Sequence, residues 1–192
     1  MINTYTWHCN NVREKQPSLQ YHNFSHVMGV VRTVNDICNE EGLVLHKARA
    51  IVAGLYHDVI YLPGANDNEE KSAEYFLSIE PDEYEIADMI KHTSINDHIS
   101  SDITFENNPY SSALLDADLS SLSCTVFSFM RAQESILFEN SKTTEDILLS
   151  VNFLNKLREK GFIYRTPSFK SKYEDLAQRN LDWFTYCFSK GN

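Results

Sequence analysis

The sequence predicts an all-α fold, and two observations carry that prediction. Apolar residues recur at helical spacing in several segments, whereas no segment alternates apolar and polar residues between turn signals as a half-buried strand does. The chain has 192 residues, of which 42% are hydrophobic and 23% charged, an ordinary composition for a globular protein. No repeat of fixed period and no low-complexity segment interrupts the pattern. We therefore expect a single helical domain over residues 1–192.

The first two predicted helices lie on either side of Gly42. One covers Asn23–Glu41, and Asn23 or Ser25 can cap its start. Gly42 follows its end, where glycine is common because it adopts the left-handed conformation at no steric cost. The second helix covers Lys47–Tyr56 and is apolar nearly all round, so we expect it at the centre of the fold.

Further helices follow in order along the chain. After a turn at 63–66, a third helix begins at Asp67 or Asn68, with two acidic residues in its first turn, where they favour the helix dipole. A fourth helix runs from about 81 to 93, and the polar stretch Ser94–Pro109 predicts the longest loop. The last predicted helices are Ser111–Leu119, Cys124–Asn140, Thr144–Lys160 and Ser171–Ser189.

The charge of the chain restricts its partners. With 17 basic and 27 acidic side chains the net charge is −10, which disfavours duplex nucleic acid as a partner. An anionic substrate would therefore need a cation to draw it in. No stretch approaches the length of a membrane span, residues 1–10 do not resemble a signal peptide, and the four cysteines form no C-x-x-C pair. We expect a cytoplasmic protein without a membrane partner, and the sequence leaves an oligomer open.

Several chemistries are excluded by missing motifs. The sequence contains no phosphate-binding G-x-x-x-x-G-K-[ST] or G-x-G-x-x-G loop, no G-x-S-x-G elbow and no H-E-x-x-H. None of the seven histidines has a glutamate three residues before it, which excludes the Glu-x-x-His pairs of di-iron bundles. The chemistry that remains belongs to histidine and aspartate.

Histidines and aspartates lie next to the most apolar segments. His57 and Asp58 end the most apolar helix, and a carboxylate there is costly unless it is paired, protonated or bound to a metal. Asp118 raises the same problem; Asp116 lies about 200° from it on a helix, so one of the two can face solvent. One divalent ion held by His57, Asp58, Asp118 and His26 would satisfy all four. A core histidine with an ordinary partner and a capping aspartate are the alternatives.

Three separated motifs occur in an order that resembles a known family. The segments Tyr21–His26 (YHNFSH), His57-Asp58 and Ala117–Ser120 (ADLS) are similar to the signature of the HD-domain metal-dependent phosphohydrolases, and also to motifs of the cyclic-nucleotide phosphodiesterases. This resemblance implies an all-α HD-domain helical bundle. The motif core then covers about 21–120, and helices in 121–192 pack on it.

The resemblance also implies a function and the residues that perform it. It makes His26, His57, Asp58 and Asp118 the ligands of a divalent ion, whether Mn, Mg, Fe, Co, Ni or Zn, with Asp58 also catalytic. His22 matches the histidine that protonates the leaving oxygen in the phosphodiesterases, a task that suits its ordinary pKa near 6.5. The expected reaction is the hydrolysis, by metal-bound water, of a phosphoester or phosphoanhydride in a small molecule, with a nucleotide as the favoured substrate. A non-catalytic HD module that binds a nucleotide or metal, and an unrelated helical interaction protein, are the alternatives.

Other residues have weaker candidate roles. Glu69 can orient the attacking water or simply favour the start of its helix. His92 and His98 can bind a second metal, bind substrate phosphate or line the loop. Candidate phosphate partners, each of which can equally belong to a solvated helix face, are Lys71, Lys91, Arg131 and Arg165.

The sequence also departs from the phosphodiesterases. The residues Ile60-Tyr61-Leu62 stand where those enzymes usually carry Asp-His, and the chain is much shorter than a phosphodiesterase catalytic domain. Both differences argue against a cyclic-nucleotide enzyme.

Overall fold

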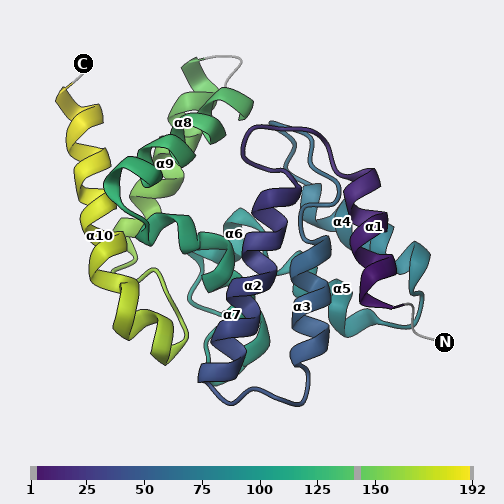
Figure 1. Ribbon diagram of the computed structural model, residues 1–192. Helices are drawn as coiled ribbons and strands as arrows, with labels where there is room; N and C mark the ends of the chain where they lie inside the picture. The colour runs from purple at the N-terminus through teal and green to yellow at the C-terminus, as the bar shows by residue number, and fades with distance from the viewer. Residues whose placement is uncertain (1–3, 141–143, 191–192) are drawn as a thin grey trace.

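The computed structural model describes residues 4–140 and 144–190, and within them the chain is helical with no β-strand (Figure 1). The prediction of an all-α fold is confirmed. The elements are α1 (Tyr5–Lys15), α2 (Phe24–Glu40), α3 (Lys47–Tyr56), α4 (Asn68–Ile79), α5 (Tyr84–Lys91), α6 (Ile95–Ile99), α7 (Pro109–Asp118), the 3-10 helix η1 (Leu119–Ser123), α8 (Val126–Asn140), α9 (Thr144–Glu159) and α10 (Pro167–Lys190).

The centre of the fold is formed by α2, α3 and α7, which pack against one another. Each contributes small or branched apolar side chains that are fully or almost fully buried, so the three helices interlock closely. The predicted central helix is α3, and its bounds agree with the sequence. The buried side chains at this junction include Val27, Val30, Val34, Ala50, Ala53, Leu114 and Ala117.

The remaining helices lie on two sides of this centre. In Figure 1, α1, α4 and α5 lie on one side, and α3 contacts all three. On the other side lie α8, α9 and α10, with α10 packed against η1. Because η1 continues directly from α7, the C-terminal helices are attached next to the end of a central helix.

The structure differs from the predicted helices in four main places. The sequence missed α1, which is mostly polar and is recognisable chiefly by its cap, where the Thr4 hydroxyl accepts a hydrogen bond from the amide of Trp7. The predicted loop Ser94–Pro109 contains α6, a helix too short to show a periodic pattern. The fourth predicted helix begins later, at Tyr84, because Pro81 lies in a turn. The last begins earlier, at Pro167, a residue suited to the first helical position.

No single helix of the described residues is both long and apolar enough to cross a membrane. Two segments, Pro109–Ser123 and Val126–Asn140, pass that test only when taken together, and a bend of 110° separates them.

A glycine in α3 lets that helix approach α2 and α7. A methyl group at Gly54 would lie 3.4 Å from Leu114 Cδ1, 3.5 Å from Val30 Cγ1 and 3.7 Å from Val34 Cγ2, which are ordinary contact distances. We predict that Gly54→Ala keeps or raises the free energy of unfolding, by up to about 1 kcal/mol, because alanine favours the helix. Gly54→Leu should lower it by about 1–3 kcal/mol through overpacking. Urea unfolding of both variants measures these changes. Equal free energies of unfolding for Gly54→Ala and Gly54→Leu would contradict close packing of α3 at this position.

Candidate metal centre

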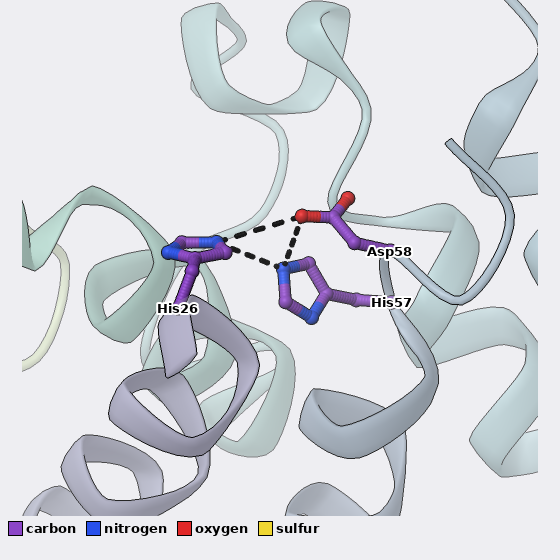
Figure 2. Close-up of side chains that lie close together, drawn as sticks. All are labelled: His26, His57 and Asp58. Atoms are coloured by element: carbon purple, nitrogen blue, oxygen red, sulfur yellow. Dashed lines mark hydrogen bonds and ion pairs between the residues drawn. The ribbon is translucent and has the colours of Figure 1, made fainter. Parts of the chain in front are cut away.

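Three helix ends meet at one point of the fold. His26 is the third residue of α2, His57 and Asp58 directly follow the last residue of α3, and Asp118 is the last residue of α7. Figure 2 shows the side chains of His26, His57 and Asp58 pointing toward one another. Neighbouring residues on a continuous helix diverge, so the end of α3 at Tyr56 is what lets both His57 and Asp58 reach this point.

The donor atoms of these four residues lie close together. The His57 Nε2 atom lies 3.0 Å from Asp58 Oδ2 and 3.4 Å from His26 Nε2. The Asp118 Oδ1 atom lies 3.2 Å from His26 Nε2 and 3.4 Å from His57 Nε2. For His26, His57 and Asp58 the possible ligand atoms all lie within 4.8 Å of one another, a spacing that suits a metal ion.

The backbone of α3 fixes the orientation of the His57 ring. Its Nδ1 atom lies 2.8 Å from the carbonyl oxygen of Gly54, which can only accept a hydrogen bond. Nδ1 therefore carries a proton, and the lone pair of neutral His57 is on Nε2, facing His26. Two imidazole nitrogens facing each other at 3.4 Å need a cation or a proton between them.

The chain after Asp58 is tied to α4. The Ser72 hydroxyl accepts a hydrogen bond from the amide of Ile60 and donates one to its carbonyl, while the Asn68 side chain bonds both the amide and the carbonyl of Leu62. Ser72 and Asn68 are themselves buried. The segment 67–72, which follows the His-Asp pair in the sequence, thus holds the turn that presents Asp58.

The pKa values show how strongly the four residues depend on opposite charge. Burial lowers the pKa of His57, but the carboxylates of Asp58 and Asp118 outweigh burial and raise it well above its ordinary value. The pKa of His26 is also raised, because the same carboxylates outweigh its burial. Burial raises the pKa of both aspartates, but their histidine neighbours outweigh it and lower both below the usual range.

The comparison with protein families agrees with this geometry. The family model described as HD domain matches residues 23–151, which is more than half of the chain. The chain belongs to the HD-domain family. The match begins at the N-cap of α2 and includes His26, His57, Asp58 and Asp118. Comparison with curated proteins and comparison with solved structures gave no match.

His22 lies beside the four residues of this HD domain and is held by α8. Its ring lies 5.9 Å from the ring of His26 and is stacked at 3.7 Å on Tyr61. Its Nδ1 atom lies 2.6 Å from Glu139 Oε2, and the same carboxylate accepts hydrogen bonds from the backbone amides of Tyr21 and His22. Burial raises the pKa of Glu139, but these bonds outweigh it and lower that pKa.

The three weaker candidates among the acidic residues and histidines, Glu69, His98 and His92, have different surroundings. Glu69 is half-buried, and burial together with the negative charges of Asp58 and Asp118 raises its pKa. His98 is buried, with Nε2 at 3.0 Å from Asp118 Oδ2. His92 instead bonds Ser111, with its Nδ1 atom 2.9 Å from the hydroxyl.

The predicted phosphate partners are not gathered at the centre. Lys71 forms an exposed ion pair with Asp67, and Lys91 forms one with Asp88. Arg131 is exposed and forms no ion pair within the part of the chain that the structure describes. Arg165 is buried and donates hydrogen bonds to backbone carbonyls. Their roles toward a substrate remain predictions.

Sequence reasoning missed Glu139 and gave other roles to Arg165 and Asp116, which also support the HD site. Glu139 is at the end of α8, more than a hundred residues from His22, and no local pattern marks it. From the sequence Arg165 resembles an ordinary surface cation, whereas in the structure its guanidinium bonds backbone carbonyls. Asp116 was expected to face solvent if Asp118 faced inward; in fact it is fully buried and accepts hydrogen bonds from the backbone amides of Arg165 and Thr166.

The raised pKa values of His26 and His57 predict that metal and protons compete. Both rings bind protons more tightly than a free imidazole, and a ligand histidine must be neutral, so metal binding should release up to about two protons per ion. We expect Mn²⁺ affinity to rise as the pH increases through the ordinary histidine pKa of about 6.5 and above it, because both pKa values are raised. Isothermal titration calorimetry in buffers of different ionisation enthalpy measures the proton count.

A matched control is His46→Gln, since His46 lies at the opposite end of α3 and pairs with Glu85. This variant should release the same number of protons as the wild type. Affinity that does not change with pH would contradict histidine ligation.

Proposed function

We propose that this HD domain is a metal-dependent phosphohydrolase that cleaves a phosphoester or phosphoanhydride of a small molecule, with a nucleotide as its substrate. The observation that carries the proposal is the meeting of two imidazole nitrogens and two carboxylate oxygens at three helix ends, with the contacts at 3.0–3.5 Å. Metal-assisted hydrolysis of a phosphoester uses such a centre to hold the metal ion. It also uses a proton for the leaving oxygen and an ordered approach of the attacking water.

The donor set fits a divalent cation. His26 and His57 would supply nitrogen ligands, and Asp58 and Asp118 would supply oxygen ligands, a mixed set that suits Mn, Fe, Co, Ni or Zn and also permits Mg. When bound, the cation lowers the pKa of a water molecule and offsets negative charge on the phosphoryl oxygens. Asp58 and Asp118 would be neutralised locally, which matters in a chain of net charge −10.

In this proposal His22 is the proton donor. Because the Glu139 carboxylate only accepts hydrogen bonds, the Nδ1 atom of His22 carries a proton and Nε2 is the nitrogen that can exchange one with a substrate. The bond from Nδ1 to Glu139 Oε2 at 2.6 Å holds the His22 ring, and stacking on Tyr61 fixes its plane. His22 would hold a proton at Nε2 and give it to the leaving oxygen.

Glu69 supports the same proposal from α4. Its carboxyl is half-buried at the start of that helix, and its raised pKa makes it a better proton acceptor than an exposed glutamate. In this role Glu69 would orient water next to Asp58.

Removal of one histidine should separate this proposal from its alternatives. We predict that His57→Ala loses retained metal and hydrolysis together, because His57 contacts Asp58, Asp118 and His26. The measurement is metal content by mass spectrometry and phosphate release from a panel of nucleotides with Mn²⁺, Mg²⁺ or Co²⁺. Full activity in this variant would sink the proposal. Thermal stabilisation of the wild type by metal or nucleotide without product would instead identify a non-catalytic binding module.

A second variant tests the proton donor. We predict that His22→Gln lowers kcat about 10²–10⁴-fold on a substrate with a poor leaving group, while Mn²⁺ affinity is retained, because His22 contacts Glu139 rather than the aspartates. On a p-nitrophenyl ester, whose leaving group needs no proton, the loss should be much smaller. Equal losses on both substrates would rule out His22 as the general acid.

A further inference from the structure

A buried histidine outside the four donor residues binds one of them. His98 in α6 places Nε2 at 3.0 Å from Asp118 Oδ2, whereas the other oxygen of Asp118 faces His26 and His57. A carboxylate accepts hydrogen bonds, so His98 donates from Nε2. The bond occupies Oδ2 and leaves Oδ1 directed at the two ligand histidines.

The other nitrogen of the His98 ring has no partner. His98 is 3% exposed, and its Nδ1 atom is buried without a hydrogen bond among the described residues. A histidine that served only to fill the core would be costly here, because a buried polar atom without a partner destabilises the fold. Among the described residues, the one hydrogen bond of the ring is that to Asp118, which points to orientation of that carboxylate.

The short helix that carries His98 is held by a distant arginine. Arg165 donates from Nη2 to the carbonyls of Asp97 at 2.7 Å, His98 at 3.1 Å and Ser100 at 3.2 Å, and from Nε to the carbonyl of Ile103 at 3.0 Å. A five-residue helix has little stability of its own, so these bonds to its last turn and the chain after it help to fix its position, together with the bond from Lys160 Nζ to the His98 carbonyl at 3.1 Å.

Arg165 is in turn fixed to the helix that carries Asp118. The Asp116 carboxylate in α7 accepts hydrogen bonds from the backbone amide of Arg165 at 2.8 Å and from the amide and hydroxyl of Thr166 at 2.7 Å each. A closed set of contacts therefore runs from Asp116 through Arg165 to His98 and returns to α7 at Asp118.

We infer that His98 is a positioning residue for the metal ligand Asp118, and that Arg165, anchored by Asp116, sets the place of His98. The inference rests on the metal binding of the proposed function. It assigns the C-terminal segment 163–166, outside the family match, a direct part in the geometry of the metal centre. Partners that orient metal ligands commonly affect affinity about 10–100-fold.

Three substitutions at one position test the inference. His98→Gln keeps an N–H donor at about the reach of Nε2, His98→Asn is polar but too short, and His98→Leu cannot donate. We expect His98→Leu and His98→Asn to weaken Mn²⁺ binding about 10–100-fold and to change the visible absorption of the Co²⁺ protein. His98→Gln should stay within about threefold of the wild type and keep its spectrum.

Comparing the wild type with these variants distinguishes failure of the inference from failure of the proposed function. Wild type that binds no Mn²⁺ or Co²⁺ would overturn both. Wild type that binds, together with His98→Asn and His98→Leu of unchanged affinity and spectrum, would overturn the inference alone. A loss in His98→Gln as large as in His98→Leu would also overturn it, since the donated bond would not be the determinant. Urea unfolding of each variant shows whether it is folded, and His98→Asn keeps the test decisive if His98→Leu does not fold.

Discussion

Two carboxylates in contact with the same pair of imidazole rings are the constraint on which the rest of the site depends. Asp58 and Asp118 are both largely withdrawn from water, and leaving either charge unpaired would cost several kcal/mol. Their partners in the described structure are histidines, whose pKa values rise because of them. The site is therefore stable only with positive charge between its members, supplied by protons or by a cation.

The hydrophobic core makes this concentration of charge possible. The four donor residues stand at the ends of α2, α3 and α7, and those helices are held together by buried apolar side chains along their length. Burial of that apolar surface, at about 25 cal/mol per Å², offsets the cost of crowding polar groups at one end. Helix ends are also where adjacent residues such as His57 and Asp58 can reach the same point.

The sequence predicted most of the helices and named the four donor residues as one group. It could not predict the distant side chains that support this site. Strong periodicity located α2 and α3, whereas the polar α1 and the five-residue α6 give no such pattern. His26, His57, Asp58 and Asp118 were recognisable because each lies beside an apolar run or in a motif. Glu139 and Arg165 act through contacts that span long stretches of chain, and such pairings are invisible in a single sequence.

The placement of Arg165 bears on the cation that the proposed function requires. Its guanidinium is buried against the backbone carbonyls of Asp97, His98 and Ser100, so its charge stabilises the backbone around His98. Within the described ranges, no lysine or arginine forms an ion pair with Asp58 or Asp118. The same arrangement that orients Asp118 thus leaves the neutralisation of the substrate to the ion that Asp118 would hold.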